Sequence, residues 1–214
     1  EIFPVLNTIF EKIYGESHYK SPTDMGVNMA GNCICDDEAC REASKQEIIR
    51  RYFDALNALA KGSTSEKEAQ KIELLMNMAG ITVTDRKVVI KALERAKETD
   101  GPAAALELRD GRIITGKTTN LLGASAALLL NVLKVLAGID HETHIISPES
   151  IEPIQKLKVD YLKSKNPRLH TDEVLIALSA SAATNPQARL ALSQLPELAG
   201  CQAHTSVMLS DVDI

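Results

Sequence analysis

Residues 102–116 read Pro-Ala-Ala-Ala-Leu-Glu-Leu-Arg-Asp-Gly-Arg-Ile-Ile-Thr-Gly and lie near the middle of the chain. Two short runs suited to extended structure flank Asp110 and Gly111, a pair that tolerates the positive φ required by a tight turn. The pattern predicts a β-hairpin over residues 103–115, with Gly116 ending the second strand.

A long apolar helix is predicted directly after the hairpin. Between residues 121 and 139 the only polar side chains are Ser125, Asn131 and Lys134, so the segment has no solvated face and is expected to be buried on most sides. Asn131 and Lys134 argue against a membrane span, because each would be costly in hydrocarbon. The helix is therefore expected to pack on a sheet inside a folded domain.

Helices dominate the expected structure of residues 1–100, because apolar residues recur there at helical spacing. A long polar loop over residues 16–38 interrupts them. After the central helix we predict a buried strand at residues 144–147, three helices, and a last strand at residues 202–209. A helical connection between strands implies parallel pairing. The predicted fold class is α/β, with a mainly helical region followed, over residues 101–214, by a three-layer α/β/α domain with a mixed sheet.

The composition argues against several classes of function. The 214 residues carry a net charge of −5 and only 3% are aromatic, so neither a basic surface nor stacking platforms for nucleic acid are expected. Four cysteines in a chain of this length do not suggest a disulfide framework. We therefore expect a cytoplasmic protein that binds neither nucleic acid nor membrane. The helical pattern begins directly at Glu1, which suggests a fragment of a longer protein.

Residues 111–118, Gly-Arg-Ile-Ile-Thr-Gly-Lys-Thr, match the phosphate-loop pattern G-x-x-x-x-G-K-[ST]. That motif needs a strand before its first glycine and a curled loop between the glycines. Here Gly111 belongs to a turn and residues 112–115 form a strand, so a true phosphate loop is not predicted. The junction that follows still offers free amides and Lys117 to an anion. Alternatively, Thr118 or Thr119 only caps the next helix.

No metal site is predicted. The spacing Cys33-x-Cys35-x4-Cys40 is not that of a structural zinc site, and free thiols are the simpler interpretation. The 5 histidines are scattered, without the spacing of a zinc protease or a catalytic triad. The acidic run that begins at Asp36 is interpreted as the solvated start of a helix.

One ligand site is predicted from the order of elements. In α/β sheets, ligands bind where the carboxyl ends of strands lead into helices, and such junctions are expected at residues 116–120, 147–150 and 168–172. Their cations, hydroxyls and helix amides would suit a phosphate. Helix caps that share no cleft are the alternative. The sequence assigns no catalytic residue and no cofactor. The candidate anion-binding residues are Lys117, Thr118, Thr119, Asn120, Ser147, Arg168 and His170.

Several motifs together resemble the C-terminal part of the bacterial family numbered 1846 among domains of unknown function. The resemblance covers essentially the whole chain and implies no activity, because that family is uncharacterised. It implies longer intact members, whose N-terminal part includes a Gly-rich segment similar to a phosphate-binding loop. The motifs are Ser21-Pro-Thr-Asp-Met-Gly-Val-Asn-Met-Ala-Gly, Arg41-Glu-Ala-Ser-Lys-Gln-Glu-Ile-Ile-Arg-Arg-Tyr, Gly116-Lys-Thr-Thr-Asn-Leu-Leu-Gly-Ala-Ser, Ile146-Ser-Pro-Glu-Ser-Ile-Glu-Pro-Ile-Gln and Asn166-Pro-Arg-Leu-His-Thr-Asp-Glu-Val-Leu-Ile-Ala-Leu-Ser.

The C-terminal part of that family is also similar to the three-layer arrangement of cytidine deaminases. Those enzymes carry H-x-E at the start of the helix after the hairpin and P-C-x-x-C at a later helix start. Here the corresponding positions read Thr118-Thr119-Asn120 and, over residues 148–152, Pro-Glu-Ser-Ile-Glu. Neither contains a His or Cys ligand, so we predict a cytidine-deaminase-like topology without its zinc site.

Two functions remain open from the sequence. The first is an enzyme that acts on a nucleotide or a phosphorylated small molecule, with its site at the junction with the missing N-terminal part. The second is a non-catalytic module that forms a homo-oligomer and positions that N-terminal part. The composition fits either function.

Overall fold

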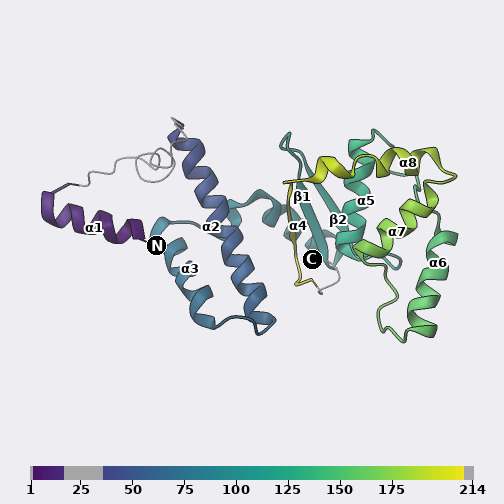
Figure 1. Ribbon diagram of the computed structural model, residues 1–214, viewed down its shortest axis with the longest axis horizontal. Coiled ribbons are helices and arrows are strands. Elements are labelled where there is room, and N and C mark those ends of the chain that lie inside the picture. Colours follow the sequence, from purple (N-terminus) through teal and green to yellow (C-terminus); the bar gives the residue numbers. More distant parts are fainter. Residues whose placement is uncertain (1, 17–35, 210–214) are drawn as a thin grey trace. The chain divides into compact units, whose positions relative to one another are not determined.

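The structure is a computed structural model that describes residues 2–16 and 36–209. The chain divides into two compact units, residues 1–86 and residues 87–214, and each is described by itself (Figure 1). The sequence placed the domain boundary near residue 100. The structural division falls earlier because helix α4 (Lys87–Thr99) packs against the strands of the second unit.

The first unit is helical, as the sequence predicted. It contains α1 (Ile2–Tyr14), α2 (Asp37–Ala60), α3 (Glu66–Ala79) and a short 3-10 turn, η2 (Val83–Asp85). Helix α2 begins where the carboxylate of Asp36 accepts a hydrogen bond from Ala39 N at 2.9 Å, which satisfies a free amide of the first turn. Helices α2 and α3 pack together. Residues 17–35, which hold most of the expected polar loop, lie outside the described residues.

The second unit is built on a three-stranded sheet with the order β2-β1-β3. The hairpin of β1 (Ala103–Glu107) and β2 (Ile113–Lys117) confirms the prediction, and β3 (Gln202–Thr205) pairs with the other edge of β1. Helix α4 covers one face and α5 (Ala124–Leu136) covers the other (Figure 1).

Alternation along the strands explains how both faces of the sheet are covered. Ala105 packs with Val88 and Ala92 of α4, whereas its neighbour Ala104 packs with Leu128 of α5. Successive residues of a strand point to opposite faces, so an unbroken run of small apolar residues can serve two helices at once. The unit is therefore layered as helix, sheet and helix.

A further group of helices covers the outer side of α5. It consists of α6 (Pro148–Lys156), a π-helical turn η3 (Leu157–Tyr161), α7 (Thr171–Ser181), α8 (Pro186–Leu192) and a 3-10 turn η4 (Leu195–Leu198). Helix α5 is buried between this group and the sheet, as expected from its composition. In the described part of the chain, no helix is both long and apolar enough to cross a membrane.

Two predictions about the sheet are wrong. Strand β3 is antiparallel to β1, so the described sheet is not mixed, and the parallel pairing between residues 87 and 209 is limited to a single bridge of Leu122 with Leu169. Residues 144–147 do not form a strand. Ile145 and Ile146 are both buried, at 2% and 5% exposure, in the core beneath α5 and α7. Two successive inward side chains are incompatible with the alternation of a strand that has one buried face.

The position of Gly116 also differs from the prediction. It does not end the second strand but pairs with Ala104 inside β2. Helix α5 crosses β2 here so closely that a Cβ atom on Gly116 would lie 2.2 Å from Leu128 N and 2.5 Å from Leu128 Cα. Only glycine permits this contact, because backbone atoms cannot move aside as a flexible side chain can.

We predict that Gly116→Ala destabilises the second unit by about 3 kcal/mol or more, because the added methyl group overpacks the contact between β2 and α5. Urea denaturation followed by far-UV circular dichroism would measure the loss. Gly101→Ala is the matched control, since its Cβ would meet nothing nearer than Thr99 O at 3.8 Å. Equal stability of the two variants would contradict the prediction.

Candidate functional site

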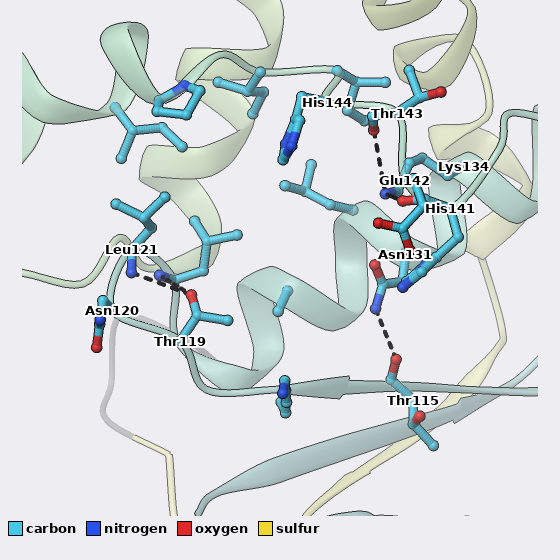
Figure 2. A pocket seen from close by; sticks show the side chains of 18 of the residues that line it. Thr115, Thr119, Asn120, Leu121, Asn131, Lys134, His141, Glu142, Thr143 and His144 are labelled. Carbon is cyan, nitrogen blue, oxygen red and sulfur yellow. Dashed lines mark hydrogen bonds between the residues drawn. The ribbon is translucent and has the colours of Figure 1, made fainter. Parts of the chain in front are cut away.

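A cavity of about 580 Å³ lies in the second unit beside β2 and α5 (Figure 2). The connection from β2 to α5, the loop that follows α5 and the start of α6 complete its wall. Part of the lining is apolar and formed by aliphatic side chains. These are Leu121, Leu122, Ala127, Leu130, Ile145, Ile146 and Ile151.

The remaining lining is polar and rich in basic groups. Lys117 is exposed and has no ion-pair partner among the described residues. Arg95 pairs with Glu98 at 3.1 Å and keeps a buried Nε with no hydrogen-bond partner in the described part of the chain. Glu142 is the acidic residue among those that line the cavity. The polar lining consists of Arg95, Thr115, Lys117, Thr119, Asn120, Asn131, Lys134, His141, Glu142, Thr143 and His144.

Thr119 fixes the connection between β2 and α5 at one end of the cavity. Its hydroxyl accepts hydrogen bonds from Leu121 N at 3.2 Å and Leu122 N at 3.0 Å, and its own N–H donates to Leu122 O at 2.9 Å. Figure 2 shows this turn and the neighbouring Asn120 well away from Asn131 and Lys134. The side chain of Thr119 is therefore a structural part of the wall.

Lys134 holds the loop at the opposite end. Its ammonium group donates to the carbonyl oxygens of His141 and Thr143, and this bonding fixes the segment that carries His141, Glu142 and His144 (Figure 2). Burial lowers the pKa of Lys134, and the nearby carboxylates of Glu142 and Asp140 partly oppose that shift.

Asn131 joins α5 to the edge of the sheet. Its Nδ2 donates to Thr115 O at 2.9 Å, as Figure 2 shows. Asn131 and Lys134 are the polar residues in the second half of α5, and they stand one helical turn apart on the side of the cavity. The composition of this helix alone could have marked both as candidate site residues, because polar side chains in an otherwise apolar buried helix need a partner.

The structure brings together three of the residues predicted for the anion site. Lys117, Thr119 and Asn120 line the cavity, whereas Thr118, Ser147, Arg168 and His170 do not. Thr118 N extends the hairpin by donating to Pro102 O at 2.8 Å. The hydroxyl of Ser147 lies 3.1 Å from that of Ser150 in the first turn of α6.

Arg168 and His170 are held by contacts of their own. Arg168 Nε donates to Thr119 O at 2.8 Å, and His170 occupies the N-cap position of α7. Lys158, which is 6% exposed, donates from Nζ to Arg168 O and to Glu173 Oε2, both at 2.6 Å. The same carboxylate oxygen accepts from His170 N at 2.8 Å. This network fastens η3 to the start of α7, and it does not gather Lys117, Arg168 and His170 around one cavity.

Residues 2–16 and 36–209 contain no group of three His, Cys, Asp or Glu side chains that could hold a metal ion. Cys33 and Cys35 lie outside the described residues. Cys40 and Cys201 are free thiols. The prediction that the protein binds no metal stays a prediction.

The fold is that of an α/β protein with a cavity in its second unit. Two family models match the chain, the domain of unknown function DUF1846, N-terminal, over residues 1–80 and DUF1846, C-terminal, over residues 84–214. The chain therefore belongs to the DUF1846 family. The sequence had placed it in the C-terminal part alone, but it spans parts of both domains, and their boundary lies close to the structural division at Arg86.

Bacterial proteins of the UPF0371 group are similar to the whole chain. The UPF0371 protein cu0538 of Corynebacterium urealyticum is 58% identical, and the UPF0371 protein of Corynebacterium aurimucosum is 59% identical, each over 213 residues. The UPF0371 protein str1377 of Streptococcus thermophilus is 54% identical over 213 residues. The match covers 100% of this chain and 43% of each relative, so the chain spans less than half the length of these relatives.

We predict that Lys158→Met destabilises the second unit by about 3 kcal/mol, because it leaves the Glu173 carboxylate without its cationic partner. Urea denaturation measures the change. Lys156→Met is the control, since its pair with Glu152 is exposed and worth about 0.5 kcal/mol or less. The double variant Lys158→Met/Glu173→Gln should recover part of the loss. A Lys158→Met variant as stable as Lys156→Met would disprove this account.

Proposed function

We propose that the second unit binds a small anionic molecule, such as a nucleotide or another phosphorylated metabolite, in the cavity beside β2 and α5. The observation that carries the proposal is one cavity that combines an aliphatic lining with Lys117 and Arg95. Its volume of about 580 Å³ is typical of small-molecule sites. Lys117 has no ion-pair partner in the described part of the chain, and such an ammonium group favours an anionic ligand group.

An enzymatic role fits the same cavity. His141, His144 and Glu142 line it, and imidazole and carboxylate groups are the usual carriers of protons in catalysis. The reaction would then take place on a ligand held by Lys117. The cytidine-deaminase-like topology stays a prediction that the hairpin followed by a buried helix supports, while the antiparallel β3 argues against the parallel order expected with it.

Ligand-induced thermal stabilisation tests the proposal. Ribose 5-phosphate and nucleoside monophosphates should raise the melting temperature, and Lys117→Ala should weaken their binding about tenfold through loss of a charged hydrogen-bond donor. Lys165→Ala is the matched control, because Lys165 is exposed and does not line the cavity. Equal effects of the two variants, or no stabilisation by any phosphorylated compound, would exclude the anion site.

A second function, assembly, is favoured by exposed apolar side chains in η3 and directly after it. Leu157, Tyr161 and Leu162 are 50%, 78% and 69% exposed within one short segment. Contiguous exposed apolar groups commonly mark contact surfaces. We propose that this segment contacts a second copy of the chain in a homo-oligomer. The alternative partner is an additional part of the longer polypeptide found in relatives.

Light scattering tests assembly of this chain with itself. We predict a mass above the 23.2 kDa of one chain for the unmodified protein and a mass near that value for Tyr161→Asp, because a charge in an apolar contact surface is left without a partner. Leu93→Asp on α4 is the control, since Leu93 is exposed to 47% on a different element. A monomeric unmodified protein would rule out self-assembly through this segment.

A further inference from the structure

We infer that the cavity selects, among anionic ligands, those that carry a neutral amino group on a heterocyclic base. The inference rests on the proposed function and names the ligand class of the same site. It depends on the way α5 presents Asn131 at the end of the cavity away from Asn120.

The hydrogen bond between Asn131 and β2 determines which atom of this amide faces the cavity. A backbone carbonyl can only accept a hydrogen bond, so the group 2.9 Å from Thr115 O must be the NH₂ of Asn131. The amide oxygen, Oδ1, then points away from the strand. Figure 2 shows it directed toward the side on which Glu142 and His144 lie. No hydrogen bond to Oδ1 exists among the described residues.

The neighbouring side chains make this end of the cavity rich in acceptors. Glu142 contributes a carboxylate, and both Glu142 and Asn131 line the cavity. Lys134 stands at the same end and uses two of its three N–H groups on the carbonyl oxygens of His141 and Thr143. Asn131 Oδ1 can only accept, so a ligand group that bonds to it must be a hydrogen-bond donor.

The charge of Lys134 restricts the kind of donor. A protonated amine would be placed near another ammonium group and repelled by it, whereas the exocyclic amino group of a nucleobase is neutral and still donates. A keto base offers one ring N–H beside its keto oxygen, so it can satisfy one acceptor and sets its own acceptor against the others at this end. An exocyclic amino group has two N–H bonds, one for Asn131 Oδ1 and one for a second acceptor such as Glu142. The cavity therefore distinguishes amino bases from keto bases.

The two ends of the cavity would then bind different parts of one molecule. Lys117 follows Thr115 by two residues along β2, toward the turn at Thr119. Two residues of a strand span about 7 Å. An anionic group at Lys117 and an amino base at Asn131 fit a nucleoside monophosphate, with the aliphatic side chains in contact with the sugar and the base.

Two pairs of ligands that differ in the amino or keto group test the inference by calorimetry. The first pair is AMP and IMP, which have purine bases, and the second is CMP and UMP, which have pyrimidine bases. A preference in only one pair would show which type of base carries the amino group that the cavity binds. In at least one pair the amino member should bind about tenfold more tightly than the keto member. Asn131→Leu should reduce that preference to less than about twofold.

Asn77→Leu is the matched control, because it makes the same change at an exposed position of α3 outside the cavity and should leave the preference intact. Equal affinities within about twofold in both pairs would overturn the inference even if Asn131→Leu failed to fold, since that comparison needs only the unmodified protein. A preference that persists in Asn131→Leu would overturn it as well. If either result were found while ribose 5-phosphate still bound through Lys117, the proposed anion site would stand and the base selectivity would be rejected. If no phosphorylated compound bound, both the anion site and the base selectivity would be rejected.

Discussion

The contact between Gly116 and the backbone of Leu128 is the constraint on which the second unit depends. It brings α5 against β2 at a distance that no side chain could occupy. This approach lets Leu128 and Val132 reach Ala104 of β1, while the other side of α5 supports α7 and α8 through Leu130 and Leu133. One helix therefore belongs to both apolar cores, and a shift of α5 would disturb the two together.

The same placement of α5 creates the cavity. A wholly apolar helix would close on its neighbours along its full length, but Asn131 and Lys134 require hydrogen-bond partners. Asn131 finds its partner on β2 and Lys134 finds two in the loop that follows α5. These bonds hold the strand and the loop at fixed positions, and the space left between them is the cavity. The candidate site is thus a result of satisfying two polar groups in an apolar layer.

The sequence predicted what depends on local patterns and missed what depends on distant contacts. The hairpin, the burial of α5 and the helices of the first unit follow from turn residues and periodicity within short windows. Strand β3 reaches β1 across about 100 residues, as in the pairing of Ala105 with His204, and no local signal gives its direction. Among the residues that line the cavity, the sequence singled out Lys117, Thr119 and Asn120 because they lie at the end of β2 and in the connection that follows it, and their role in binding an anion stays a prediction. The loop at His141 and His144 was missed because residues 144–147 were predicted to be a strand and the partners of Lys134, the carbonyl oxygens of His141 and Thr143, were not foreseen.

Strand β2 forms an edge of the sheet, and such edges invite pairing with other chains. Thr118 N donates to Pro102 O, and Leu108 N donates to Arg112 O. In this antiparallel pair the backbone N–H and C=O groups of the even-numbered residues from 112 to 118 therefore point toward β1, and those of Thr115 point to the open edge. Asn131 Nδ2 already donates to Thr115 O, a carbonyl oxygen that an incoming strand would need as an acceptor. Lys117 also places a charge at the end of β2, which is only 5 residues long. The residue that closes one end of the cavity therefore also protects the protein against aggregation through its sheet.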